Sequence, residues 1–151
     1  FKSAITNWDI PSLSDIGDFE LYEENKKTAT VTVRNRSSQS IFKAYLRAAY
    51  QNRCCITGCN VVETLEACHI VPVAEDGSPD PRNGLLLRSD IHKLFDCDLI
   101  QINPETRTIV VDSSLKNTEY YLLNGKPLSK PLNSYSHFQP HQSALKQKWD
   151  R

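Results

Sequence analysis

The chain of 151 residues is 39% hydrophobic and 24% charged, which fits one compact domain of ordinary composition rather than two independent domains. Its 18 basic residues balance its 18 acidic residues, which argues against a protein that coats nucleic acid by bulk charge but is compatible with a local basic face. No apolar run approaches the length of a membrane span and no signal segment follows Phe1, so we expect a cytoplasmic protein without a membrane partner.

Two residue counts add to this picture. A chain without methionine does not include its own initiator, so we expect a processed protein or a piece of a longer one. The five cysteines are an odd number and follow no secretory signal, which favours a reducing compartment over a disulfide framework. A structural zinc site with Cys55 and Cys59 as one half is the alternative, but no second cysteine pair follows at ligand spacing and only Cys68 and Cys97 remain.

The N-terminal third predicts a turn-rich stretch, a strand and a helix. Residues 8–16 are rich in turn formers, and the alternating residues 28–33 predict a β-strand. A helix follows, capped by Ser38 or Ser40 and ending near Gln51, because apolar residues recur there at the helical period. Its apolar face consists of Ile41, Phe42, Tyr45, Leu46 and Ala49.

The middle of the chain predicts a strand, a loop and a second helix. Residues 61–73 are apolar enough for a buried hairpin strand, and residues 74–83 contain the Asp, Gly and Pro residues typical of a loop. The helix begins with Ser89 as its N-cap and ends near Asp96. A strand–loop–helix unit can bring its two ends together, so the histidines of its strand and helix, His69 and His92, are expected to flank one small pocket.

The C-terminal third predicts a hairpin, a further strand and a last helix. Residues 99–102 and 108–112 are strand-like and are joined by a turn that contains Asn and Pro. Residues 120–123 predict another strand before an Asn-Gly turn. The tail from Gln139 or Pro140 to Trp149 predicts a helix.

Three segments around the two histidines resemble the HNH endonucleases, whose nuclease core is the ββα-metal fold. The segments are Ala-Cys-His-Ile-Val-Pro at 67–72, Asn-Gly-Leu-Leu-Leu at 83–87 and His-Lys-Leu-Phe-Asp at 92–96. The Cys-Ile-Thr-Gly-Cys segment at 55–59, preceded by Arg36, Gln39 and Phe42 on a leading helix, is similar to a bacterial group within that family.

The resemblance covers residues 34–131 and implies a fold of the α+β class, with a ββα-metal core, a flanking helix and β-hairpins. Together with the residue patterns, it predicts an N-terminal extension with one or more strands over residues 1–33, an HNH nuclease domain over 34–131 and a C-terminal helical tail over 132–151.

The resemblance also assigns roles to three residues, His69, Asn83 and His92. His69 is expected to be the general base that deprotonates the attacking water, while Asn83 orients the loop and holds His69 by a hydrogen bond. His92 is expected to bind a divalent metal that stabilises charge on the phosphate and on the departing 3′ oxygen. A metal-bound imidazole has used its lone pair, so the two histidines must have different roles.

The metal ligands depart from the commonest family pattern. Many members carry Asp just before the first histidine, where this chain has Cys68, and a thiolate suits zinc better than magnesium. Asp96 lies four residues after His92 on the same helical face. We expect His92 and Asp96 to be the ligands, rank Cys68 lower, and keep closure of the helix end as the alternative role of Asp96. The expected ion is Mg²⁺ or Mn²⁺, with Ni²⁺ or Zn²⁺ as alternatives.

The sequence therefore predicts a metal-dependent DNA endonuclease, the cleavage module of a restriction or antiphage (antiviral) defence protein. An RNase or toxin-like nuclease of the same fold and a non-cleaving DNA-binding module are the alternatives. The expected partners are double-stranded DNA, a missing recognition or sensing domain or subunit, and a second copy of the chain in a homodimer. Candidate phosphate contacts are Lys43, Arg47, Arg53, Arg88 and Lys93.

Overall fold

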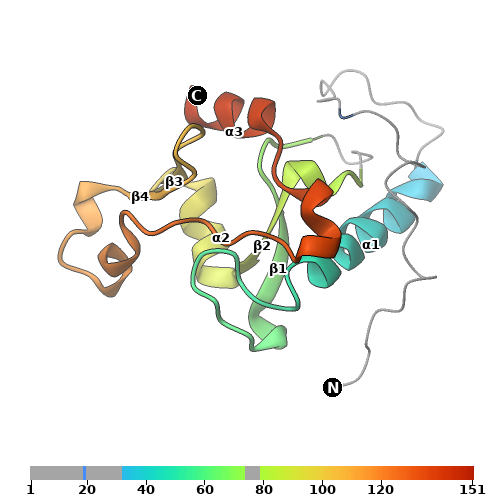
Figure 1. The fold of residues 1–151 in the computed structure, drawn as a ribbon, viewed down its shortest axis with the longest axis horizontal. Coiled ribbons are helices and arrows are strands. Elements are labelled where there is room, and N and C mark those ends of the chain that lie inside the picture. The colour runs from blue at the N-terminus through green and yellow to red at the C-terminus, as the bar shows by residue number, and fades with distance from the viewer. Residues whose placement is uncertain (1–18, 20–31, 74–78) are drawn as a thin grey trace.

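The computed structural model describes Phe19, residues 32–73 and residues 79–151, with the backbone alone for residues 32–37. Within these residues, three α-helices accompany two antiparallel two-stranded sheets, which confirms the predicted α+β class (Figure 1). None of the described helices combines the length and the apolar character that crossing a bilayer requires. The elements are α1 (Thr32–Ala49), β1 (Leu65–His69), β2 (Gly84–Arg88), α2 (Ser89–Asp96), β3 (Ile100–Ile102), β4 (Ile109–Val111) and α3 (Gln142–Trp149).

The β1–β2 hairpin lies between α1 and α2 and forms the centre of the fold (Figure 1). Its register pairs Cys68 with Leu85 and His69 with Gly84. Successive side chains of a strand point to opposite faces, so the hairpin presents Cys68 to α2 and His69 to α1. This alternation places the two neighbouring residues in different surroundings.

Strand β2 is buried on both faces, because residues 84–87 are all buried. A strand covered on both sides is a continuous apolar run without alternation. Periodicity therefore gives no signal for β2, and only the resemblance to the ββα-metal fold implied it.

Helix α1 packs its apolar face on the hairpin, with Phe42 and Leu46 buried as predicted. The helix already begins at Thr32, so the predicted strand is wrong for residues 32–33, while residues 28–31 lie outside the described residues, as does the turn-rich stretch 8–16. Ser38 and Ser40 lie inside the helix and do not cap it. A helix anchored by tertiary packing propagates through a segment with only a weak preference for strand.

Helix α2 has the predicted extent, but Ser89 is its first helical residue and not its N-cap. The chain passes directly from β2 into the helix, and Arg88 occupies the N-cap position. The start of α2 is held by Asp90, which accepts hydrogen bonds from the Arg88 guanidinium at 2.6 and 3.0 Å and from the Tyr120 hydroxyl at 2.8 Å.

Several other boundaries differ from the prediction. The expected strand over 61–73 is confined to β1 and preceded by a 3-10 turn at Val62–Thr64. The expected loop over 74–83 ends in a 3-10 turn at Pro81–Asn83, and residues 74–78 lie outside the described part. Residues 120–123 belong to a 3-10 helix, Glu119–Leu123, rather than a strand, because the Thr118 side chain accepts a hydrogen bond from Tyr120 N and caps it.

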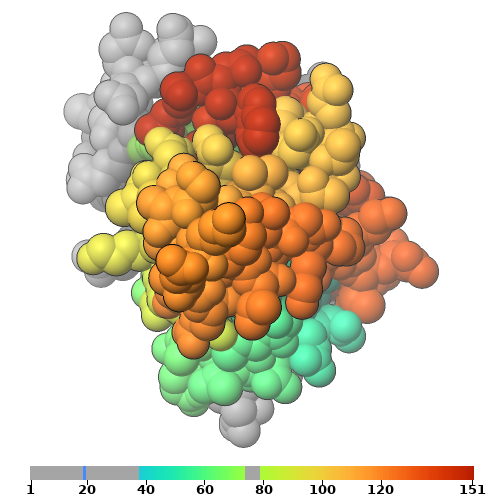
Figure 2. Space-filling model, turned by 90° about the vertical axis from the view of Figure 1, so that its left-hand side faces the viewer, coloured from blue at the N-terminus to red at the C-terminus, as the bar shows by residue number. Residues whose placement is uncertain are grey.

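The β3–β4 hairpin and α3 lie next to each other. The β3–β4 hairpin confirms the predicted pair of strands, and α3 packs beside β3. In the space-filling view α3 (red) lies next to the gold residues of this hairpin (Figure 2). The last helix begins at Gln142, later than predicted, because the His141 side chain accepts a hydrogen bond from Ser143 N and caps it.

Candidate active site and metal centre

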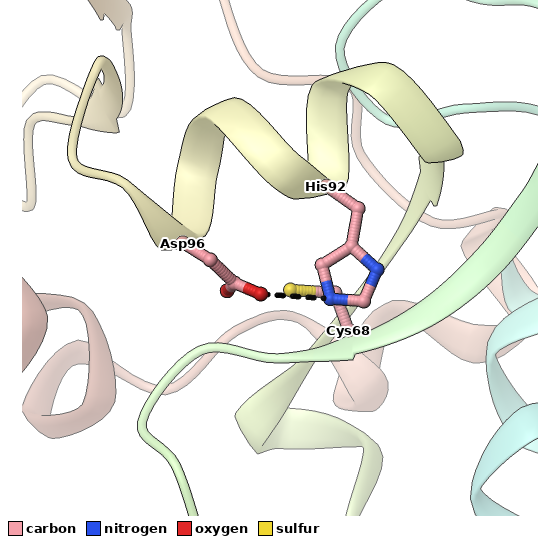
Figure 3. Close-up of side chains that lie close together, drawn as sticks. All are labelled: Cys68, His92 and Asp96. Atoms are coloured by element: carbon pink, nitrogen blue, oxygen red, sulfur yellow. Dashed lines mark ion pairs between the residues drawn. The ribbon is translucent and has the colours of Figure 1, made fainter.

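Three side chains that could hold a metal ion, those of Cys68, His92 and Asp96, lie close together. Each offers one donor atom, and the three atoms lie within 4.8 Å of one another. Figure 3 shows His92 and Asp96 extending from successive turns of α2 toward Cys68 on β1. Among the described residues, no other group of three or more His, Cys, Asp or Glu side chains is gathered in this way.

The spacing of the donors fits a divalent ion. The Nε2 atom of His92 lies 3.3 Å from Oδ2 of Asp96. Bonds of about 2.0–2.2 Å at a tetrahedral ion hold nitrogen and oxygen donors about 3.3–3.5 Å apart. The distance between these two donors therefore already suits shared coordination.

Glu66 orients the imidazole of His92, a role that the sequence analysis missed. The Nδ1 atom of His92 lies 2.7 Å from Oε1 of Glu66. With Nδ1 donating to this carboxylate, Nε2 keeps its lone pair and faces Asp96 and Cys68. A carboxylate behind a metal-binding histidine is the usual outer partner in such sites. The available signal was the spacing of two between Glu66 and Cys68, which places both on one face of a strand.

Cys68 is a buried member of this group, with 1% of its surface exposed. Burial raises the pKa of its thiol well above the ordinary value, and the nearby charge of Asp96 raises it further. A divalent cation reverses this effect, because a coordinating thiol loses its proton. Sequence reasoning ranked Cys68 below Asp96, whereas the structure places the thiol with both other donors.

Cys54 and Cys55, at the start of the Cys-Ile-Thr-Gly-Cys region, support the hairpin. Cys54 Sγ accepts hydrogen bonds from Thr57 N and Arg88 N, each at 3.3 Å. Cys55 Sγ accepts one from Leu86 N at 3.4 Å. Both thiols are thus engaged with the backbone of the turn and of β2.

His69 and His92 line the same pocket, of about 330 Å³, as the strand–loop–helix argument predicts. Two cations of α3 and its end, Lys148 and Arg151, also line it, and sequence reasoning missed both. The other lining residues are Ala67, Ile70, Pro72, Val73 and Asp96.

The imidazole of His69 is fixed by a neighbouring ring. Phe42 of α1 stacks on it, with ring centroids 4.0 Å apart and planes 5° from parallel. Its Nε2 atom is buried. The imidazole is therefore held in one orientation at the end of β1.

Asn83 connects the two ends of the loop that follows β1. Its Oδ1 accepts a hydrogen bond from Val71 N and its Nδ2 donates one to Val71 O, both at 3.0 Å. Its own backbone oxygen accepts from Ile70 N at 3.0 Å. The sequence predicted a hydrogen bond to His69, but the amide binds the backbone two residues farther on, because both of its polar atoms face that backbone.

The candidate phosphate contacts do not gather at this pocket. Lys43, Arg53 and Lys93 are exposed on the surface. Arg47 donates from Nε to Asn52 at 2.8 Å, and Arg88 is paired with Asp90. None of these five residues lines the pocket that holds the two histidines.

Comparison with known proteins agrees with the geometry. Residues 54–103 match the family described as HNH endonuclease. No curated protein matches the chain. The matched range contains the β1–β2 hairpin, α2, both pocket histidines, Asn83 and all three candidate metal ligands. The match supports the resemblance to the HNH endonucleases found in the sequence, and residues 54–103 are the part of the chain that is similar to that family.

Proposed function

We propose that this chain is a divalent-metal-dependent DNA endonuclease that hydrolyses phosphodiester bonds. The observation that carries the proposal is that His69 lines the same pocket as His92 and Asp96, two of the three residues whose donor atoms are close enough to hold a metal ion. The HNH family match supports nuclease activity. Hydrolysis of a phosphodiester is assisted by a base that deprotonates water and by a cation that stabilises the developing charge, and this pocket offers residues for both.

His69 acts as the general base. Its Nε2 is buried, so Nδ1 is the nitrogen that accepts the proton of the attacking water. The water oxygen bonds to phosphorus while the bond from phosphorus to the 3′ oxygen breaks, which leaves 5′-phosphate and 3′-hydroxyl ends. The stacked Phe42 ring keeps the imidazole oriented during this step. Positioned general bases contribute about 10²–10⁴ in rate.

His92 has a different role because both of its ring nitrogens are committed. Glu66 takes Nδ1, which leaves Nε2 for the ion together with Asp96 and Cys68. The bound ion supplies charge stabilisation for the phosphate and the departing 3′ oxygen. Asn83 supports the base indirectly by holding the turn after His69.

A plasmid-cleavage assay tests the role of His69 as the general base. Supercoiled DNA is incubated with wild type, His69→Ala and the control His137→Ala, an exposed histidine that does not line the pocket, in Mg²⁺, Mn²⁺, Ni²⁺, Zn²⁺ or EDTA. We expect metal-dependent cleavage by wild type and the control, and a loss of about 10²–10⁴ in rate for His69→Ala. Cleavage by His69→Ala at the wild-type rate would remove His69 from the mechanism.

The sulfur donor bears on the choice of ion. A site with one thiolate, one imidazole and one carboxylate suits Zn²⁺ or Ni²⁺ better than Mg²⁺, in contrast to the Mg²⁺ or Mn²⁺ favoured from the sequence. With Co²⁺ as the probe, we expect a thiolate-to-metal charge-transfer absorption in wild type and in the exposed control Cys97→Ser, but not in Cys68→Ser. The same absorption in Cys68→Ser would exclude Cys68 as a ligand.

The biological setting proposed for this activity is restriction or antiphage defence, in a reducing cytoplasm that suits a thiol ligand. Duplex DNA is the proposed substrate, and parallel assays on single strands and RNA distinguish it from an RNase. We also predict that a recognition or sensing part outside this chain directs the cleavage, and that two copies of the chain form a homodimer. The ratio of nicked to linear plasmid tests whether two copies pair. A single active site cuts one strand, so linear product without a nicked intermediate indicates a pair.

A further inference from the structure

The end of α3 brings two basic residues to the candidate active site. Lys148 and Arg151 both line the pocket that holds His69 and His92. Lys148 lies in the last turn of α3, and Arg151 follows two residues after the helix ends at Trp149. Neither residue falls within the family-matched range 54–103, so the family match gives them no role.

Lys148 fixes the end of α3 to the helix that carries the metal-binding residues. Its ammonium group donates to Phe95 O at 2.9 Å, pairs with the Asp98 carboxylate and lies 4.5 Å from the centre of the Phe95 ring. Only 5% of Lys148 is exposed. A lysine buried to this degree and satisfied by three partners is an anchor that sets the distance between α3 and α2.

The other end of α3 is held as well. Arg107 donates from Nη1 to Pro140 O at 2.8 Å, and His141 N donates to Arg82 O at 2.8 Å. With both ends attached to the body of the molecule, Arg151 follows a helix of defined position. Its side chain is exposed, and it forms no ion pair with any described residue.

The charges around the pocket leave the substrate phosphate without a cation of its own, and Arg151 can supply one. Asp96 and Glu66 carry negative charge, and Cys68 adds a third once an ion binds, so the two positive charges of the ion are already more than balanced. The charge of Lys148 is balanced by Asp98. A phosphodiester entering this pocket therefore needs a further cation, and a planar guanidinium fits two phosphate oxygens.

We propose that Arg151 binds a phosphate of the nucleic-acid substrate at the active-site pocket and that Lys148 is the positioning residue that holds it there. The last helix then belongs to the active site. This inference rests on the proposed function, because the anion that Arg151 receives is the substrate's phosphate.

Salt-dependent binding tests the contact without cleavage. A short DNA duplex is titrated in EDTA at several salt concentrations with wild type, Arg151→Gln and the control Lys146→Gln, an exposed residue of the same helix that is paired with Asp150 and lies outside the pocket. We expect Arg151→Gln to weaken binding several-fold and to reduce the slope of log K against log salt by about 0.9, the value for one phosphate. Arg151→Lys restores the slope, because the slope reports charge.

Two binding results overturn the inference. One is an Arg151→Gln slope equal to that of Lys146→Gln, and the other is a wild type that does not bind the duplex. An altered slope together with a wild type that cleaves with no metal would refute the proposed nuclease while leaving the phosphate contact in place. The experiment therefore distinguishes failure of the Arg151 phosphate contact from failure of the proposed metal-dependent nuclease activity.

Cleavage kinetics test the role of Lys148. We expect Arg151→Gln to lower kcat/KM by about 10–100-fold, as for loss of a hydrogen bond to a charged group. Asp98→Asn removes the partner of Lys148 outside the pocket and should give a smaller loss, which disappears in the Arg151→Gln background. Additive losses in the double variant, or no loss in Arg151→Gln, would contradict the assignment.

Discussion

Gly84→Ala tests the packing that holds His69 in place. Gly84 lies opposite His69 in the hairpin, with φ −144° and ψ 157°, an extended conformation open to any residue. The substitution therefore brings no backbone strain, and its cost comes from contacts alone. A Cβ at this position would lie 2.5 and 2.6 Å from two ring carbons of Phe42 and 2.9 Å from Cδ1 of Leu46.

The magnitude follows from these distances. Carbon atoms in contact are normally about 3.5–4.0 Å apart, so the new methyl group overlaps the Phe42 ring by about 1 Å. Phe42 is 1% exposed and stacked on His69, so the ring has no free space to enter. Overpacking of this kind costs about 1–3 kcal/mol, and we expect Gly84→Ala to lie in the upper half of that range. The melting temperature should fall by about 4–12 °C in a chain of this size.

The assay is urea denaturation of wild type, Gly84→Ala, Phe42→Leu and the double variant. Leucine lacks the ring atoms that meet the new methyl group, so Gly84→Ala should cost at least about 1 kcal/mol less in the Phe42→Leu background. Because the displaced ring is the one that stacks on His69, cleavage should fall even where Gly84→Ala is fully folded. A cost below about 0.5 kcal/mol, or an equal cost in both backgrounds, would refute the reasoning.

Three further predictions concern the surroundings of the site. Asn83→Ala leaves two buried backbone groups of Val71 without their partner and should lower the free energy of unfolding by about 2–5 kcal/mol in chemical denaturation; an unchanged value would contradict the bridging role. The pKa of Asp90 is lowered to about 2, chiefly by the hydrogen bonds from Arg88, against about 3.9 when unfolded, so its stabilisation is complete above about pH 4 and is lost as pH falls through about 2. The difference in stability between wild type and Asp90→Asn should follow that pH course, and a constant difference would count against it. Glu66→Ala should weaken metal binding about 10–100-fold in calorimetry, whereas wild-type affinity would mean that the carboxylate does not support the metal-binding imidazole.

Elements with a local signal could be predicted from the sequence. Helix α2 and the β3–β4 hairpin were predicted because their apolar periods and turn residues lie within a few positions of one another. The pairing of His69 and His92 in one pocket also followed from the order of strand, loop and helix. Residues 32–33 and 120–123 were assigned to strands because short alternating or apolar segments carry weak preferences that contacts elsewhere override.

The sequence by itself determined the α+β class, the family resemblance and the choice of His69, Asn83 and His92 as candidate site residues. These inferences depend on residue types at short spacings. Only the tertiary structure decided how they meet: Glu66 bonded to His92, Cys68 beside the other two candidate metal ligands, and Lys148 and Arg151 at the pocket. The last helix joins the site through the hydrogen bond from Lys148 to Phe95, 53 positions apart in the chain, and Arg151 follows the end of that helix. Packing over such a separation leaves no periodic trace in the sequence, so only the fold could reveal it.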